Sequence, residues 1–374
     1  MIKQRLVIDE EVPYMKNILE PYADVVYMKG SAIDRRSLEG AHGLIIRTRT
    51  LCTPALLEGT DVTFIGTATI GTDHIDMEYC RRSGIHVASA AGCNAGAVAQ
   101  YVLTAMVSMA YRQRKRLENM TLGIIGVGNV GSKVAQMALA LGMRVLLNDP
   151  PRALKEGNAG FTSLECLLTQ ADVISLHVPL QPDTVHMVDA RFFERLVRTP
   201  LFINTSRGAI VDEAALMCFA PKVSGVVLDV WENEPAISKA VLDAASIATP
   251  HIAGYSVEGK RKATVMMVRE LAAFFGWKAL KNFSLPSIPA QRITFSDVVK
   301  NGDEALYLLL NKVFPIFEED FKLRLAPDRF EALRSEYLYR RENSGCQIKG
   351  TAVEEIPLGV LQAIGFGKTL EGKV

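Results

Sequence analysis

The sequence lacks the cysteine patterns of disulfide-bonded and metal-binding proteins. Its six cysteines, at positions 52, 80, 93, 166, 218 and 346, include no Cys-x-x-Cys pair and no short cluster with histidine. Paired cysteines are common in small secreted domains, whereas scattered cysteines are typical of reduced intracellular proteins. We therefore expect free thiols, no metal site and a cytoplasmic location.

An excess of one charge sign is also missing. Lys and Arg total 42 and Asp and Glu total 41, so the net charge is +1 at pH 7, and no long basic run is present. Surfaces that bind nucleic acid or anionic membranes carry a concentration of positive charge. Neither partner is expected here. The first eleven residues, MIKQRLVIDEE, turn acidic too early for a secretory signal peptide.

No apolar run is long and uninterrupted enough for a clear membrane span. The most apolar stretch, residues 95–111, contains Gln100 and is followed by a basic segment at residues 112–116. A membrane helix needs about 20 mostly apolar residues, so this stretch is better interpreted as a buried helix. The chain of 374 residues is too long for one ordinary core, and two or three domains are expected.

Short apolar segments alternate with helical patterns through most of the chain. Such alternation predicts parallel sheets. Strands are expected at residues 5–8, 24–28, 43–47, 62–65 and 86–88, and again at 121–125, 143–148, 172–176, 201–204, 225–228 and 246–248. Long helices at 94–116 and 257–275 would connect the two sets. The predicted fold class is α/β, with two Rossmann-like, doubly wound parallel-sheet domains and a cleft between them for substrate.

A glycine fingerprint opens the second set of strands. Gly126, Gly128 and Gly131 follow the predicted strand 121–125 in the spacing Gly-x-Gly-x-x-Gly, with Asn129 and Val130 inside the loop. This pattern lets the backbone approach a pyrophosphate at a helix N-terminus. Asp149 ends the next predicted strand, 18 residues after Gly131. A carboxylate there suits the ribose hydroxyls and repels a 2′-phosphate, so the predicted cofactor is NAD rather than NADP.

Three charged residues follow the later predicted strands. Arg207 lies in Asn204-Thr-Ser-Arg-Gly, Glu234 follows Asp229-Val-Trp-Glu-Asn, and His251 follows Thr249-Pro250. Each alone is more often a surface or structural residue. Together they supply a base for a hydroxyl proton, a carboxylate that orients the base, and a cation for a substrate carboxylate. The other histidines are not part of such a set of charged residues in the sequence, and His74 is expected to be structural.

The order of these motifs resembles the D-isomer-specific 2-hydroxyacid dehydrogenases over residues 1 to about 280. The branch that acts on 4-phospho-D-erythronate is the nearer match. The residues that carry the resemblance are the glycine fingerprint, Ser206-Arg207-Gly208, Asp229-Val-Trp-Glu, Glu234-Pro235, Phe64 to His74, Asp149-Pro-Pro-Arg152, His251-Ile-Ala-Gly-Tyr255 with Glu258-Gly-Lys260, and Tyr337 to Glu342. This similarity implies His251 as proton donor and acceptor, with Arg207 and Glu234 as its partners.

The resemblance also implies binding residues. NAD contacts would fall at the Gly126–Gly131 loop, Asp149, Val178, Thr205, Ser206, Arg207, Asp229 and Gly254, and substrate contacts at Thr48, Thr69 and Tyr255. For either threonine alone, a turn hydroxyl bonded to local backbone is the plainer interpretation. Departures from the family pattern are Ser206 in place of cysteine, Asn233 in place of glycine, and Val178, which lacks the hydroxyl of the usual threonine. Arg340 or Arg341 is a candidate for a substrate phosphate.

We expect three domains. Residues 1–93 and 256–284 would form a flavodoxin-like substrate-binding domain, residues 94–255 the NAD-binding Rossmann domain, and residues 285–374 a smaller α+β domain. The last would follow a linker at 282–293 and contain helices at 304–317 and 329–341 and a strand at 347–353. In the resembling enzymes this third domain serves dimerisation, so a homodimer is expected.

The sequence therefore predicts an enzyme that oxidises a phosphorylated 2-hydroxy acid with NAD. The nearer resemblance implies 4-phospho-D-erythronate as substrate, 2-oxo-3-hydroxy-4-phosphobutanoate as product, and a place in pyridoxal 5′-phosphate (vitamin B6) biosynthesis. Two alternatives stay open. One is a dehydrogenase for D-3-phosphoglycerate or another D-2-hydroxy acid, and the other is a non-enzymatic NAD-sensing protein on the same fold.

Overall fold

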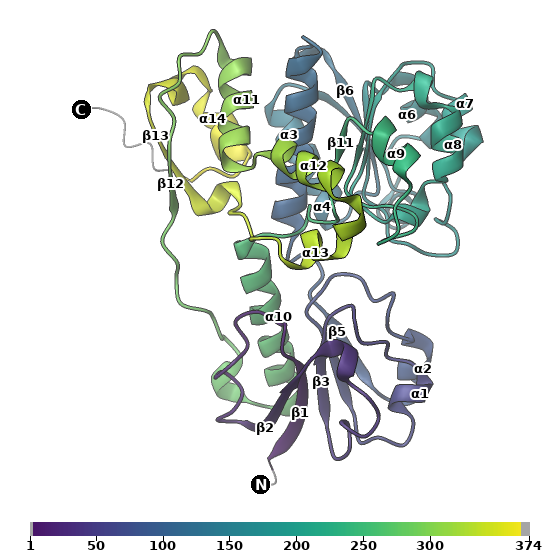
Figure 1. Cartoon of the computed structure of the whole chain (residues 1–374), viewed down its shortest axis with the longest axis vertical. Helices are drawn as coiled ribbons and strands as arrows, with labels where there is room; N and C mark the ends of the chain where they lie inside the picture. Colours follow the sequence, from purple (N-terminus) through teal and green to yellow (C-terminus); the bar gives the residue numbers. More distant parts are fainter. Residues whose placement is uncertain (1–2, 368–374) are drawn as a thin grey trace. The chain divides into compact units, whose positions relative to one another are not determined.

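The computed structural model describes residues 3–367, which divide into two compact units. The first comprises the residues up to Asn94 together with Val257–Ile288, and the second comprises Ala95–Ser256 together with the residues from Pro289 onward. Each unit contains its own parallel sheet (Figure 1). The predicted α/β class with two parallel-sheet domains is confirmed.

The first unit is built on five parallel strands in the order β2-β1-β3-β4-β5, the flavodoxin-like arrangement. Side chains alternate between its two faces. Leu6 and Ile8 of β1 pack with α10, whereas Val7 packs with α1 and α2 on the other face (Figure 1). The elements are β1 Gln4–Asp9, β2 Ala23–Met28, β3 Gly43–Ile46, β4 Phe64–Thr67, β5 His86–Ser89, α1 Pro54–Leu57, α2 Met77–Arg82 and α10 Val257–Phe275.

The second unit contains six parallel strands in the order β11-β10-β9-β8-β6-β7. Helices α3 and α4 cover one face, and α6 to α9 cover the other. The elements are β6 Thr121–Ile125, β7 Arg144–Asn148, β8 Val173–Leu176, β9 Leu201–Asn204, β10 Gly225–Leu228, β11 Ile247–Ala248, α3 Ala95–Arg112, α4 Asn129–Ala140, α5 Pro150–Glu156, α6 Leu164–Gln170, α7 Ala190–Glu194, α8 Glu213–Cys218 and α9 Lys239–Ala244. Most of the apolar stretch 95–111 is buried within α3. No helix in residues 3–367 is long and apolar enough to span a membrane.

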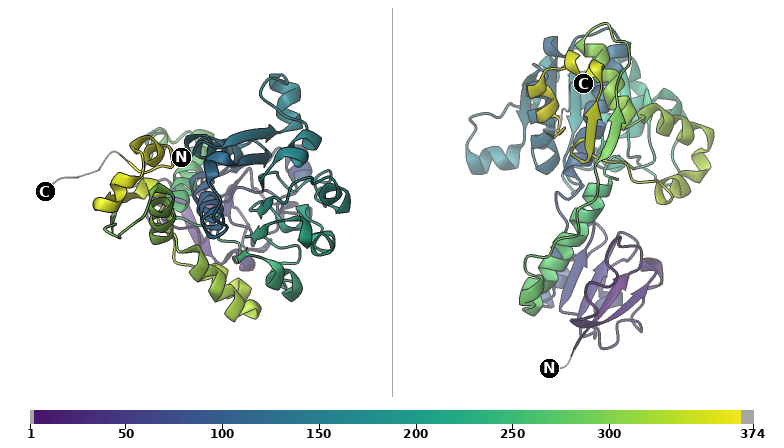
Figure 2. Two further views of the ribbon diagram at one scale, coloured as in Figure 1. Left: turned by 90° about the horizontal axis from the view of Figure 1, so that it is seen from above. Right: turned by 90° about the vertical axis from the view of Figure 1, so that its left-hand side faces the viewer.

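The C-terminal residues belong to the second unit and pack on its other elements. Strands β12 (Gln291–Thr294) and β13 (Cys346–Lys349) run side by side as a parallel pair (Figure 2). The helices are α11 Gly302–Val313, α12 Ile316–Leu325, α13 Phe330–Ser335 and α14 Leu358–Ala363. Of these, α11 packs on α3, α14 packs on α4, and α12 packs on β11 and α3.

The C-terminal predictions were wrong in several details. The helix expected at 304–317 ends at Val313, because Pro315 has no N–H for a continuing helix, and α12 starts directly after it. The helix expected at 329–341 covers only Phe330–Ser335. The strand expected at 347–353 is limited to Cys346–Lys349, with a 3₁₀ turn after it, and the end of the expected linker forms β12.

Candidate active site

Three loops meet at one edge of the second sheet. They follow β9, β10 and β11, which are parallel neighbours, so their carboxyl ends lie together. The first loop carries Arg207, the second carries Asp229 to Glu234, and the third carries His251 to Tyr255. This arrangement follows from strand order alone, and it brings residues up to 48 positions apart into one site.

His251 and Glu234 form a hydrogen-bonded pair across two of these loops. His251 Nδ1 lies 2.8 Å from Glu234 Oε2, and the two side chains are 25% and 19% exposed. Glu234 Oε1 accepts the backbone N–H of Trp231 at 2.9 Å. Burial alone would raise the pKa of Glu234, but the hydrogen bond and charge of His251, the Trp231 N–H and the charge of Arg334 lower it below its usual value. The carboxylate therefore stays ionised beside the imidazole.

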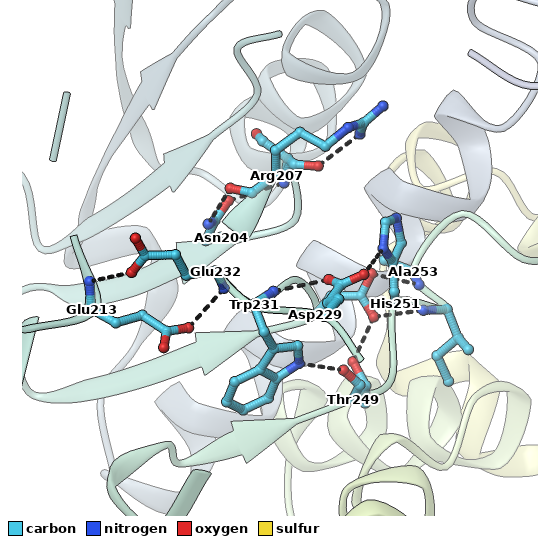
Figure 3. A network of polar contacts seen from close by, with 12 residues as sticks. Asn204, Arg207, Glu213, Asp229, Trp231, Glu232, Thr249, His251 and Ala253 are labelled. Carbon is cyan, nitrogen blue, oxygen red and sulfur yellow. Dashed lines mark hydrogen bonds and ion pairs between the residues drawn. The ribbon is translucent and has the colours of Figure 1, made fainter. Parts of the chain in front are cut away.

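Asp229 fixes the backbone of the loop after β11, residues 251–255, which we call the histidine loop. Its buried carboxylate accepts hydrogen bonds from the N–H groups of Ile252 (2.8 Å) and Ala253 (2.9 Å) and from the hydroxyl of Thr249 (2.7 Å) (Figure 3). The backbone N–H of His251 donates to Asp229 O at 2.8 Å. His251 has a φ of 58°, in the left-handed region that few non-glycine residues adopt. These contacts hold the histidine in that conformation.

Arg207 lies in the neighbouring loop after β9 (Figure 3). Asn204 shapes this loop, because its side chain donates to Arg207 O at 3.0 Å and accepts the Ser206 N–H at 3.0 Å. The Arg207 guanidinium donates to Ser206 O at 2.8 Å. A Cβ at Gly208 would lie 1.8 Å from Trp231 O, so glycine at this position lets the first and second loops touch.

The glycine loop has the geometry that a dinucleotide needs. Gly126 has a φ of 89°, and a Cβ on Gly131 would lie 2.1 Å from Gly126 O, so α4 packs closely on β6. Beside Gly128 a Cβ would meet no atom within 4 Å, which leaves room for a phosphate. Asp149 accepts the N–H groups of Val127 (2.8 Å) and Arg152 (3.0 Å), and it thereby ties the loop to the end of β7.

Other expected cofactor contacts lie around this loop. The hydroxyl of Thr205 is buried and has no hydrogen-bond partner within the described structure, as expected of a group that awaits a ligand. Ser206 Oγ instead donates to Leu176 O at 2.6 Å, so this side chain holds β8 and the β9 loop together. Val178 packs with the apolar cluster that contains Leu176, and Gly254 lies in the histidine loop.

The expected substrate residues are divided between the two units. Tyr255 lies in the second unit, where its ring packs with Tyr337 and Tyr339 at centroid distances of 6.3 and 6.0 Å. Thr48 and Thr69 belong to the first unit. Thr48 is exposed in the turn after β3, and Thr69 Oγ1 bonds Thr67 Oγ1 (2.6 Å) and donates to Gly71 O (3.4 Å).

Several polar contacts near the site are not indicated by the sequence. His186 has a carboxylate neighbour that its place in the sequence does not indicate, since its Nε2 lies 2.6 Å from Glu232 Oε1. Glu232 in turn contacts Glu213, whose carboxylate accepts the Glu232 N–H at 2.9 Å (Figure 3). The charge of Arg334 of α13 also acts on Glu234, whose pKa it helps to lower. No local sequence pattern signals these pairs, because each joins residues far apart in the chain.

Arg340 occupies a different place from the one expected. Its guanidinium is buried and donates to main-chain carbonyls of its own chain, so we no longer consider it for a substrate phosphate. His74 is buried, with Nε2 3.3 Å from Thr67 Oγ1, which agrees with a structural role. Among residues 3–367 no group of three or more His, Cys, Asp or Glu side chains has the arrangement of a metal site.

Comparisons with known proteins agree on a family. Residues 93–253 match the profile of the D-isomer specific 2-hydroxyacid dehydrogenase, NAD binding domain, and residues 284–365 match a domain family of unknown function. An erythronate-4-phosphate dehydrogenase of Bacteroides thetaiotaomicron is 44% identical over 92% of this chain and 99% of its own length. That of Yersinia pestis is 39% identical over 97% of this chain and 98% of its own.

A solved structure shows the same fold with its ligands. The D-lactate dehydrogenase of Aquifex aeolicus, complexed with NAD and lactic acid, is 29% identical with a TM-score of 0.63. The similarity covers 76% of this chain and 100% of that one.

Proposed function

The chain belongs to the erythronate-4-phosphate dehydrogenase family of D-isomer-specific 2-hydroxyacid dehydrogenases, and from this we propose a function and a set of site residues. It is an NAD-dependent oxidoreductase that acts on the CH–OH group of a 2-hydroxy acid. Its substrate is 4-phospho-D-erythronate and its product 2-oxo-3-hydroxy-4-phosphobutanoate, in the biosynthesis of pyridoxal 5′-phosphate. The observation that carries the mechanism is the His251–Glu234 pair, which lies on the same sheet as the glycine loop.

We propose His251 as the base that takes the hydroxyl proton of the substrate. Its Nδ1 faces Glu234, so Nε2 is the atom left to meet the hydroxyl. Glu234 fixes the ring orientation, and its ionised carboxylate stabilises the imidazolium that forms. Arg207 binds the substrate carboxylate and polarises the reacting oxygen. NAD, when bound, supplies the acceptor for the hydride that leaves the substrate carbon.

The proposed binding residues fit these ligands chemically. NAD would be held by the Gly126–Gly131 loop, Asp149, Val178, Thr205, Ser206, Arg207, Asp229 and Gly254, a set that includes the unpartnered Thr205 hydroxyl and the open space at Gly128. Asp149 favours NAD over NADP by its charge. Thr48, Thr69 and Tyr255 are the proposed substrate contacts, on donor chemistry that suits a phosphate or carboxylate.

We also propose the division of labour along the chain. The first unit would bind substrate, Ala95–Ser256 would bind NAD, and the C-terminal residues would form a homodimer. A cytoplasmic location is supported by the six cysteines, which are thiols rather than disulfides in the described part of the chain.

A cofactor-reduction assay tests the substrate. Purified protein and NAD are mixed with 4-phospho-D-erythronate, 3-phosphoglycerate, lactate or glycerate, each with and without a 2-oxo acid acceptor, and absorbance is followed. Selectivity for 4-phospho-D-erythronate is expected. Selectivity for another acid would keep the mechanism and reject the substrate, and NAD binding without turnover of any acid would favour an NAD-sensing protein.

Replacement of His251 by Asn tests the base. Turnover should fall by about 10²–10⁴-fold, the usual contribution of general base catalysis, while NADH still binds as measured by its fluorescence. His186→Asn is a matched control, because it removes the other His–Glu pair, whose histidine is 42% exposed. It should change turnover by no more than about twofold. Near-normal turnover in the His251 variant would reject this assignment.

A further inference from the structure

Arg340, from the C-terminal residues, lies buried against the histidine loop. Its five N–H donors meet five acceptors at 2.6 to 3.1 Å. Three of these are the carbonyls of Ile252, Ala253 and Tyr255, and the others are Ala97 O and Gln100 Oε1. Every donor of this side chain is therefore used inside the protein.

The histidine loop is thus held from two sides by opposite charges. The Asp229 carboxylate accepts its N–H groups, at Ile252 and Ala253, whereas the Arg340 guanidinium donates to its carbonyls. His251 directly precedes these residues and has a φ of 58°, so its conformation depends on how the loop is held. A lysine at position 340 would offer only three donors from one point and could not span the five acceptors.

We propose that Arg340 is a positioning residue for catalysis, which acts through the 252–255 carbonyls to keep His251 aligned with Glu234. The C-terminal residues then form part of the catalytic machinery rather than an appended domain. Only the kinetic part of the following test rests on the proposed function.

A second arginine provides a matched control for simple anchoring. Arg324 of α12 also joins the C-terminal residues to the rest of the second unit through main-chain carbonyls, at Leu242 (2.8 Å) and Ala245 (2.7 Å). These carbonyls lie at the end of α9, before β11, whereas His251 follows β11. Arg324→Lys therefore weakens an anchor of the same kind without touching the histidine loop.

The experiment compares Arg340→Lys with Arg324→Lys by three measurements. The first is the imidazole NMR signal of His251, assigned by its loss in H251N. The second is kcat with 4-phospho-D-erythronate and NAD, and the third is thermal unfolding. Arg340→Lys should shift the His251 signal and lower kcat about tenfold or more, as a misplaced base does. In a further variant, Arg340→Ala, added guanidinium should restore part of the lost kcat. Arg324→Lys should lower only the Tm.

Two results would overturn the proposal. One is a His251 signal in folded Arg340→Lys that matches the wild type, and this holds whatever the substrate is. The other is an equal loss of kcat in the two lysine variants. If Arg340→Lys does not fold, Gln100→Met replaces it. This change removes one acceptor of the guanidinium, together with the Gln100 amide donation to Arg341 O and Asn343 Oδ1, and it leaves Arg340 itself in place. The same shift of the His251 signal, smaller in size, is expected, and an unchanged signal rejects the role.

Discussion

At the scale of single residues, His251 and His177 have neighbours of different chemistry. His251 meets a carboxylate that is ionised, held by the Trp231 N–H and close to the charge of Arg334. His177, in contrast, follows β8 and faces the hydroxyl of Ser175, with Nε2 3.0 Å from Oγ. His251 faces a carboxylate and His177 a hydroxyl, so the environment rather than the residue type separates their roles.

His177 gives a pH prediction. Loss of hydration lowers its pKa to about 3 from an unfolded value of 6.5. Below pH 6.5 the unfolded chain therefore takes up a proton that the folded chain refuses, and the free energy of unfolding falls with pH by up to about 1.4 kcal/mol per unit. Urea unfolding between pH 7.5 and pH 5 should show a shallower decline in His177→Gln than in the wild type. Parallel curves would contradict the prediction.

The sequence could indicate Arg207, Glu234 and His251 because each follows a recognisable strand. Parallel strands bring their carboxyl ends together, so strand order alone places these three residues in adjacent loops. Arg340 could not be found in this way. It lies 85 positions beyond Tyr255 and approaches the loop through irregular backbone, for which no periodic pattern exists. Four of its five partners are main-chain carbonyls, which carry no signal in the sequence.

At the scale of elements, the glycine loop allows the roles of two glycines to be separated. A Cβ at Gly131 would lie 2.1 Å from Gly126 O and 3.1 Å from Ile124 Cγ2. Gly131→Ala must therefore push α4 away from β6, with an overpacking cost of about 1–3 kcal/mol. Both the Tm and the NADH affinity, measured by thermal unfolding and fluorescence titration, should fall.

Gly128→Ala is the companion variant. Gly128 has a φ of −76° and open space around its Cβ position, so alanine is tolerated by the backbone. Its Tm should match the wild type while its NADH affinity falls, because the methyl group occupies the space proposed for the pyrophosphate. A wild-type Tm in Gly131→Ala, or wild-type NADH affinity in Gly128→Ala, would refute the corresponding role.

Element prediction succeeded where a hydrophobic period was long or a strand was bounded by turns. Helix α10 spans the expected residues 257–275, and the strands after residue 120 lie within a residue or two of expectation. It failed from residue 304 onward. There Pro315 divides a continuous apolar pattern into two helices, and residues 336–341 have a helical composition but extended or irregular backbone. Tertiary contacts such as the bridge between Ser256 and Arg340 outweigh local propensity in that segment.

At the scale of the whole molecule, exposed apolar side chains gather around α12. Phe321 and Leu325 lie one turn apart on this helix and are 60% and 67% exposed, and Leu338 is 89% exposed. Leu338 lies in the segment that follows α13, and α13 packs on α12. Exposed apolar groups of this kind are typical of protein interfaces. They support α12 and Leu338 as part of the proposed homodimer contact.

Leu338→Glu tests this contact by placing a charge in it. Light scattering after size exclusion should give twice the chain mass of 41.0 kDa for the wild type and a value near one chain mass for the variant, since burial of an unpaired carboxylate opposes association. Leu154→Glu is the control, because Leu154 of α5 is 88% exposed and lies far along the chain from α12. It should leave the mass at that of the dimer. A dimeric Leu338→Glu variant would show that the dimer contact does not involve Leu338. A monomeric wild type would reject the proposed homodimer. Because Arg340 is two residues from Leu338, the His251 signal of the variant would also reveal whether assembly supports the alignment of the base.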